Sequence, residues 1–383
     1  DQGEWHPRMK LTIIGRGNAG CISALHFAYH RNFINTSLEI ELIFDSKKIP
    51  VPTGIGTTLE FPQLVWQQDP SLSYADKFPT TLKRGIMYEN WGKKNKKIFH
   101  PFPLGKYAVH FNPKDFQDFT CENIKINFKE RDENISSYSE IDSDYIIDCR
   151  GKADDSKNYV KLINPLNCSL LASLPKKEND VEWTRTVATP DGWCFYIPLP
   201  DRTALGYIFN ADITSVEEAT DNFKNLFKVE KIDKVYPFDC YIAQEMVLED
   251  RVLLNGNRLF FLEPLEATAM EGYLNGCRYF WDYIFYGQSK METQKRIEDY
   301  VYKVQDFILW HYGNGSVYDT QFWKHAKEVH DAHLPDYFKK IVKTVKGMTK
   351  TDIQKSLNDN VDPPFAQWKK WNFKIWYDGV NNG

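Results

Sequence analysis

Residues 10–30, KLTIIGRGNAGCISALHFAYH, decide the fold of this chain. A β-rich apolar run leads through Gly15, Gly17 and Gly20 into a segment whose apolar residues recur at helical spacing. This is the G-x-G-x-x-G arrangement of strand, tight turn and helix, in which the absence of side chains lets a pyrophosphate approach the helix N-terminus. The pattern predicts dinucleotide binding, and the alternative is a glycine-rich turn that holds no ligand.

Strands that continue this pattern are scattered along the chain. LEIELIFD (residues 38–45) alternates as a strand does and ends in Asp45, which lies 25 residues after Gly20 (45 − 20) and could bind a ribose hydroxyl. Further strands are predicted in SDYIIDCRGKAD, GWCFYIPLPDRTALGYIF and RVLLNGNRLFFLEP. Because strands from distant segments must return to one sheet, we predict an interleaved α/β core over residues 9–289. From residue 290 to 383 the periodicity is helical and Trp is abundant, which predicts a separate helical module.

Composition excludes several classes of function. The net charge of −4 provides no basic field for nucleic acid, and no apolar run approaches the roughly 18 residues of a membrane span. Seven cysteines, odd in number and never spaced as CxxC, indicate a reducing compartment, and no histidine cluster carries an HExxH motif. We therefore expect a cytoplasmic protein without metal, disulfide, membrane or nucleic-acid partner.

RLFFLEPLEATAME (residues 258–271) places Glu263 and Glu266 directly behind an apolar run. An ionised carboxylate is costly in such surroundings unless it is paired. Acidic residues also favour the first turn of a helix, where they complement the helix dipole. From the residues alone, a helix start and a buried functional carboxylate are both open.

Five short stretches together resemble one family, the flavin-dependent halogenases, best known from tryptophan halogenases. They are GRGNAG, PTGIGTTLEFP, TLKRGIMYENW, DGWCFYIPLPDRTALGYIF and FLEPLEATA, and they occur in the family's order. The resemblance implies an FAD-binding, Rossmann-like α/β core of the aromatic-hydroxylase type, with an inserted β-sheet and a C-terminal helical substrate module. The short chain is similar in this respect to members encoded by marine phage.

The resemblance also implies an activity and its residues. Reduced FAD, O2 and halide would give hypohalous acid, which Lys83 would relay to an electron-rich aromatic small molecule with the help of Glu266. The halide would bind at Thr268 and Ala269, and Glu263 is expected to cap or bond backbone. The wall between flavin and substrate would consist of Trp193, Phe195, Ile197 and Pro198. The implied FAD contacts, besides the three glycines and Asp45, are Asn18, Ala19, Gly54, Ile55, Gly56, Gly256 and Leu262. Candidate substrate-pocket residues are His110, Tyr312, Trp323 and Trp371, with Trp368 and Trp376 as further candidates.

Departures from the family's pattern narrow these expectations. Phe195 replaces the second Trp of the WxWxIP signature, and Thr57 stands where an acid is usual. Ala269 replaces a usual Gly, and its methyl group would restrict the backbone at the halide site, so we expect bromide or iodide to be favoured over chloride. Trp91 and His110 are only 19 positions apart (110 − 91), which makes free tryptophan an unexpected substrate.

Two alternative functions and a protein partner are also considered from these residues. An FAD-dependent aromatic monooxygenase would share the nucleotide-binding sheet without needing Lys83 and Glu266, and a redox-inactive flavin-binding protein would tolerate Ala269 and Phe195. No second nucleotide motif is visible for a nicotinamide, so we expect a transient flavin reductase partner. A homo-oligomer is possible.

Overall fold

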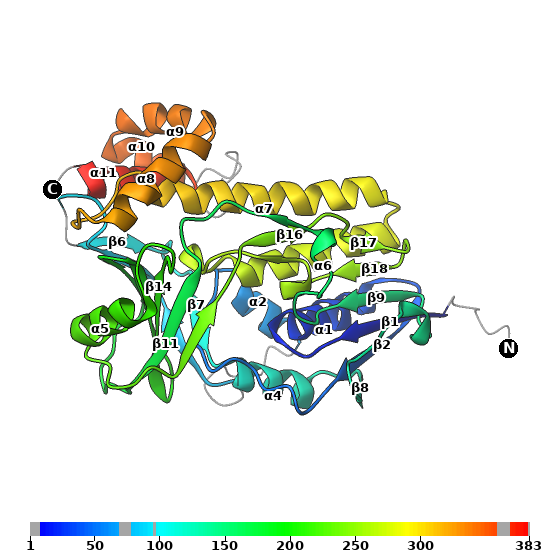
Figure 1. Cartoon of the computed structure of the whole chain (residues 1–383). Helices are drawn as coiled ribbons and strands as arrows, with labels where there is room; N and C mark the ends of the chain where they lie inside the picture. The colour runs from blue at the N-terminus through cyan, green and yellow to red at the C-terminus, as the bar shows by residue number, and fades with distance from the viewer. Residues whose placement is uncertain (1–7, 69–77, 95–96, 358–367, 382–383) are drawn as a thin grey trace, which may run out of the picture.

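One half of the molecule is built on a six-stranded sheet, seen at the right of Figure 1. The computed structural model describes residues 8–68, 78–94, 97–357 and 368–381. The strand order is β17-β18-β9-β1-β2-β8, and every neighbouring pair is parallel except β17 with β18. The strands are β1 (Arg8–Ile14), β2 (Ser37–Phe44), β8 (Asn127–Glu130), β9 (Tyr145–Asp148), β17 (Val247–Leu248) and β18 (Val252–Leu254).

Helices cover this sheet because its central strands are apolar on both faces, as parallel strands usually are. Helix α1 (Asn18–His30) follows β1 directly and packs against α4 (Pro113–Asn123) and α6 (Ala269–Phe285). The core contains Ile13 of β1, Leu25 of α1 and Cys277 of α6. The predicted strand, glycine turn and helix are therefore confirmed, and α1 begins immediately after Gly17.

A seven-stranded sheet in the order β15-β11-β14-β13-β12-β5-β6 forms the second half. Along β13, alternate side chains point to opposite faces, as the pleat requires. Cys194 and Tyr196 join a core with Phe223 of helix α5 (Val216–Phe227), whereas Trp193 and Phe195 belong to the main core on the other face. The strands are β5 (Gly85–Glu89), β6 (Lys97–Pro101), β11 (Cys168–Pro175), β12 (Thr184–Thr189), β13 (Gly192–Pro198), β14 (Arg202–Phe209) and β15 (Lys234–Pro237).

Two three-stranded sheets join the halves. One has the order β3-β7-β4 and consists of β3 (Ile55–Gly56), β7 (Ala108–Phe111) and β4 (Thr80–Lys83). The other has the order β10-β16-β19 and consists of β10 (Tyr159–Lys161), β16 (Tyr241–Ala243) and β19 (Phe260–Phe261). Short elements complete this region: α2 (Phe61–Trp66), η1 (Arg31–Phe33), η2 (Tyr138–Glu140), η3 (Ser156–Asn158), η4 (Gly256–Arg258) and η5 (Leu265–Ala267).

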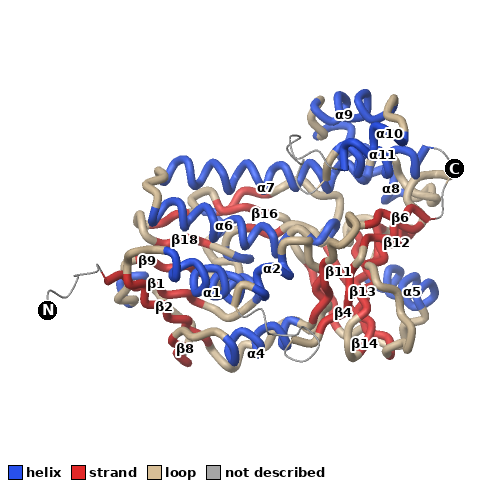
Figure 2. Tube along the Cα trace, turned by 180° about the vertical axis from the view of Figure 1, so that it is seen from behind, coloured by secondary structure: helices blue, strands red, loops and turns tan. Residues whose placement is uncertain are grey.

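Helix α7 (Lys290–Tyr312) runs along both halves, and the remaining helices gather at its C-terminal end (Figures 1 and 2). They are α8 (Gln321–His333), α9 (Tyr337–Lys346), α10 (Lys350–Leu357) and α11 (Lys370–Asn381). The predicted helical module of residues 290–383 thus begins with α7, although its residues 358–367 and 382–383 lie outside the described residues. The division into two domains stays a prediction. Among the helices described, none combines the length and apolar character needed to cross a membrane.

Candidate active site

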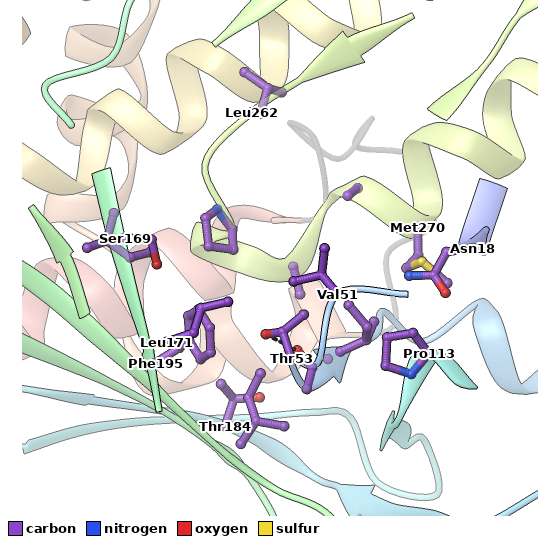
Figure 3. Close-up of a pocket in the computed structure, with 18 of the residues that line it drawn as sticks. Asn18, Val51, Thr53, Pro113, Ser169, Leu171, Thr184, Phe195, Leu262 and Met270 are labelled. Atoms are coloured by element: carbon purple, nitrogen blue, oxygen red, sulfur yellow. Dashed lines mark hydrogen bonds between the residues drawn. The ribbon is translucent and has the colours of Figure 1, made fainter. Parts of the chain in front are cut away.

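A cavity of about 370 Å³ lies between the N-terminus of α1 and the seven-stranded sheet. Figure 3 shows Asn18, Pro113 and Met270 on one side and Leu171 and Phe195 on the other. Twelve predicted site residues line it: Gly17, Asn18, Gly54, Ile55, Gly56, Lys83, Trp193, Phe195, Ile197, Leu262, Glu266 and Ala269. Segments far apart in the chain therefore meet around one space.

The end of the cavity at α1 fits a dinucleotide phosphate. A Cβ built on Gly17 would meet nothing within 4 Å, so this glycine borders open space. Because glycine has no side chain, a ligand can approach the backbone closely at this point. The buried side-chain oxygen of Asn18 has no hydrogen-bond partner in the described structure. A helix N-terminus carries free N–H groups and a partial positive charge. These features suit the pyrophosphate of FAD.

Four other predicted cofactor residues, Gly15, Ala19, Gly20 and Gly256, pack against one another around the turn between β1 and α1. A Cβ on Gly20 would lie 1.8 Å from the carbonyl oxygen of Gly15, so the helix could not approach the turn with a larger residue there. Gly256 has φ +63° and lies against Ala19 of α1. None of these four residues lines the cavity, and their role in the structure is close packing.

Asp45 follows β2, at the position expected for a ribose ligand. Its carboxylate accepts a hydrogen bond of 3.0 Å from the backbone N–H of Lys47. The backbone N–H of Asp45 is in turn bound by buried Glu133, which also pairs with Lys48 at 2.9 Å. Asp45 does not line the cavity described above. Its predicted contact with ribose stays a prediction.

The wall of the cavity on β13 depends on a glycine in the neighbouring strand. Phe195 pairs with Gly206 of β14, and a Cβ on Gly206 would lie 2.1 Å from the ring of Phe195. The ring can therefore lie over the sheet only because position 206 has no side chain. Trp193 and Ile197 line the cavity on the same face, whereas Pro198 is absent from its lining.

Lys83 ends strand β4 and is 1% exposed, although its amine reaches the cavity lining. Its Nζ donates a hydrogen bond of 2.8 Å to the carbonyl oxygen of Thr57. Burial lowers the pKa of Lys83 from 10.5 to about 8, against an opposing effect of the Glu266 charge. With a pKa of about 8, roughly a tenth of Lys83 is the free amine at pH 7. The free amine is the form that acts as a nucleophile.

His110 lies beside Lys83 but does not line the cavity. Its two ring nitrogens are bound to the hydroxyls of Thr81 at 3.0 Å and Thr184 at 2.8 Å. Burial, and to a smaller extent the charge of Lys83, holds the pKa of His110 well below its usual value. His110 is therefore a neutral ring that supports the small sheet.

Glu266 is buried and held by three side chains from three separate segments of the chain. Tyr88 of β5 donates its hydroxyl to Oε1, and Nε2 of His311 in α7 lies 3.0 Å from the same oxygen. Trp368 donates its indole N–H to Oε2 at 3.2 Å. The sequence identified Trp368 as a candidate but not Tyr88 or His311. A polar side chain within an apolar segment suggests a buried partner, and both Tyr88 and His311 stand in such segments. The neighbouring residues in sequence do not show that this partner is Glu266.

The loop before α6 has an unusual backbone. Glu266 has φ 70° and Ala267 has φ 53°, and L residues rarely adopt the left-handed region. Such strain is a feature of functional sites. Ala269 is instead the first residue of helix α6. We expected the methyl group of Ala269 to restrict the backbone at the halide site. This expectation is wrong, because Ala269 is helical and the left-handed conformation falls on Glu266 and Ala267.

Thr268 and Ala269, the predicted halide residues, begin α6. The side chain of Thr268 makes no capping hydrogen bond in the described structure, so it leaves this helix N-terminus open. Ala269 lines the cavity, whereas Thr268 is 2% exposed and does not. An uncapped N-terminus beside a cavity is compatible with an anion.

Glu263 was expected to cap a helix or to form hydrogen bonds with backbone groups, but its carboxylate is bound by side chains. Its carboxylate accepts hydrogen bonds from Tyr312 of α7, at 2.7 Å to Oε1, and from the indole of Trp193 at 3.2 Å. Burial raises the pKa of Glu263 to about 7, and these hydrogen bonds act in the opposite direction. Tyr312 therefore positions the wall residue Trp193 indirectly and does not line the cavity.

The remaining candidate pocket residues lie in the aromatic core of the helical module. Trp323 donates its indole N–H to the carbonyl oxygen of Thr189 at 2.8 Å, and Trp371 packs its ring against His100. Both are buried, and neither lines the cavity. Trp376 packs against His311. Their role in substrate binding stays a prediction.

Comparison with known proteins assigns the family. The sequence model of the tryptophan halogenase family matches residues 10–140 and 132–361, which is most of the chain. The chain belongs to the tryptophan halogenase family. Among curated members, it is 22% identical over 276 residues to tryptophan 7-halogenase KtzQ of Kutzneria sp. (strain 744), covering 62% of this chain and 51% of KtzQ. The chain thus spans about half the length of this halogenase.

Solved halogenase structures share the fold. A flavin-dependent halogenase from Xanthomonas campestris has a TM-score of 0.80 at 16% identity, covering 97% of this chain and 89% of the other. The tryptophan 6-halogenase SttH from Streptomyces toxytricini has a TM-score of 0.78 at 16% identity, covering 97% and 90%. The predicted fold class, an FAD-binding type of α/β core with a helical C-terminal region, is confirmed by this likeness.

Proposed function

We propose that the protein is a flavin-dependent halogenase that acts on an electron-rich aromatic small molecule other than free tryptophan. The observation that carries the proposal is that Lys83, buried and partly in the free amine form, shares one cavity with Glu266 and with the glycine turn of α1. A hydroxylase needs no such lysine. The family match covers all of these residues.

The cofactor would be FAD, held at its pyrophosphate by Gly17, Asn18 and the α1 N-terminus. Bound FAD, when reduced and supplied with O2, provides the oxidant that converts halide to hypohalous acid. Gly54, Ile55 and Gly56 of the cavity lining, with Leu262 opposite, would border the flavin ring and exclude water. Reduced FAD would come from a separate flavin reductase.

Lys83 would perform the halogen transfer. Its free amine attacks the halogen of hypohalous acid, so that an N–halogen bond forms, the O–halogen bond breaks and water leaves. The aromatic carbon then takes the halogen as the N–halogen bond breaks, and Glu266 relays a proton to the nitrogen of Lys83 in the same step, which restores the amine. The ring then gives up its own proton to Glu266, which replaces the proton that was relayed. Trp193 and Phe195 would keep the substrate from the flavin side.

The halide would lie near Thr268 and Ala269, at the uncapped N-terminus of α6. The favoured ions would be bromide and iodide. Their easier oxidation supports this preference, since the helical backbone of Ala269 removes the steric argument against chloride. A cytoplasmic location suits a protein whose described cysteines are all free.

The test compares wild type with Lys83→Ala. Protein, chemically reduced FAD, O2, bromide and an indole or phenol are mixed, and product mass reports halogen, oxygen or no addition. We expect a brominated product from wild type and none from Lys83→Ala, with flavin oxidation nearly unchanged. Exposed Lys129 provides the matched control, Lys129→Ala. A hydroxylated product would indicate a monooxygenase, and retained regioselective bromination by Lys83→Ala would remove this lysine from the mechanism.

A further inference from the structure

The contact between Glu266 and His311 requires a proton. Nδ1 of His311 lies 2.8 Å from the carbonyl oxygen of Phe307, which can only accept, so Nδ1 carries a hydrogen. Nε2 lies 3.0 Å from Oε1 of Glu266. In a neutral imidazole with Nδ1–H, Nε2 is an acceptor, and so is an ionised carboxylate. Two acceptors at this distance repel, so one proton must lie between them.

The shared proton makes the pair neutral. It gives either an imidazolium with a carboxylate or an imidazole with a carboxylic acid, and the net charge is zero in both forms. Tyr88 and Trp368, the other two partners of Glu266, donate hydrogen bonds but carry no charge. His311 is therefore the partner that can cancel the charge of Glu266.

The other imidazoles near this site do not carry the charge. Burial, assisted by the charge of His311, lowers the pKa of His100 on β6 to about 3. Burial likewise holds the pKa of His110 far below its usual value. Both are neutral near neutral pH. Among the described residues, the ionisable groups with an electrostatic effect that involves Lys83 are thus His110 and Glu266, and Glu266 is paired with His311.

We propose that His311 is a positioning residue that preserves the free-amine fraction of Lys83, because the proton it shares offsets the negative charge of Glu266, which favours the ammonium form. This inference rests on the proposed function of Lys83. Without His311, the buried carboxylate would need another cation, and Lys83 is a base in the same cavity that the charge of Glu266 already affects. A carboxylate close to a lysine favours the ammonium form. That form cannot attack hypohalous acid, so the halogen transfer would slow.

The inference is tested by measuring how reactive Lys83 is, independently of halogenation. Folded protein is labelled with trace acetic anhydride between about pH 7 and 10, and mass spectrometry compares Lys83 with exposed Lys129 as an internal reference. In wild type, Lys83 should become reactive with a midpoint near its pKa of about 8. In His311→Gln, which keeps an N–H donor but cannot carry the proton, relative reactivity near pH 8 should fall about fivefold, as a rise of roughly one pKa unit requires.

Two further variants separate charge from packing. Tyr88→Phe removes a neutral hydrogen bond from Glu266 and should leave the labelling midpoint of Lys83 close to the wild-type value. The double variant Glu266→Gln with His311→Gln has no carboxylate left and should also return the midpoint toward wild type. An unchanged midpoint in His311→Gln, or an equal shift in Tyr88→Phe, would overturn the inference.

The outcome is distinguishable from failure of the proposed function. Labelling reports the protonation of Lys83 whether or not a halogenated product forms. A midpoint that shifts as expected in a protein without halogenase activity supports the role of His311 and refutes the proposed reaction. Bromination by wild type with no change in the midpoint of His311→Gln refutes only the role of His311.

Discussion

Burying Lys83 should cost stability, so Lys83→Met is expected to stabilise the folded protein at neutral pH. Methionine has a similar length and no charge. The pKa of Lys83 falls from 10.5 to about 8 on burial. At about 1.4 kcal/mol for each pKa unit, the ammonium therefore costs about 3 kcal/mol. Loss of the hydrogen bond to Thr57 should return about 1 kcal/mol, so the net gain at pH 7 is about 2 kcal/mol.

The gain should depend on pH in a defined direction. Below about pH 8, Lys83 is protonated in both the folded and the unfolded state, and the full cost is present. Between about pH 8 and 10.5 only the unfolded state keeps the proton, so the wild-type free energy of unfolding rises with pH. Above the unfolded pKa the cost is gone, and Lys83→Met should be less stable than wild type by about 1 kcal/mol, the lost hydrogen bond.

Urea unfolding at pH 7 and at high pH, followed by tryptophan fluorescence, measures this difference. The other titrating groups are common to both proteins and cancel in the comparison. Lys129→Met, at an exposed position, is the matched control and should show no such dependence on pH. A Lys83→Met protein that is less stable than wild type at both pH values would show that the ammonium carries no burial cost.

Four shorter predictions concern the cavity. Gly17→Val should abolish tight FAD binding, measured by flavin fluorescence, with unchanged apoprotein melting, because its side chain enters open space; unchanged affinity would refute the phosphate assignment. Glu266→Gln should lower turnover by roughly 10²–10⁴ with little change in FAD affinity, as for a general base; wild-type turnover would exclude proton transfer by this residue. Gly206→Ala should lower stability by about 1–3 kcal/mol through its clash with Phe195, and a neutral effect in urea unfolding would contradict that packing. Ala269→Gly should leave the ratio of bromide to chloride turnover unchanged, whereas restored chloride turnover would return the preference to the methyl group.

Much of the fold is predictable because its signals are local. The glycine turn after β1 and the alternation along β13 each depend on residues that are neighbours in sequence, and backbone geometry converts such patterns directly into strands and helices. The same holds for Lys83 and Glu266, which were identified within short motifs. Both line the cavity.

The partners of these residues were not predictable in the same way. Glu263 was expected to bond backbone and instead joins Trp193 to Tyr312. No sequence motif singled out Gly206, and only the pairing of β13 with β14 reveals that the ring of Phe195 fills the space above it. A local pattern does not specify which distant segment packs against it.

The sequence by itself determined the nucleotide-binding strand, turn and helix, the family resemblance and the two candidate catalytic residues. Only the tertiary structure placed Glu266 against His311, which are 45 positions apart in η5 and α7, and buried Lys83 in the lining of the cavity that Glu266 also borders. The physical reason is that a pKa and a shared proton depend on burial and on neighbouring charges. Both arise when separate elements pack together, and no spacing along the chain encodes them.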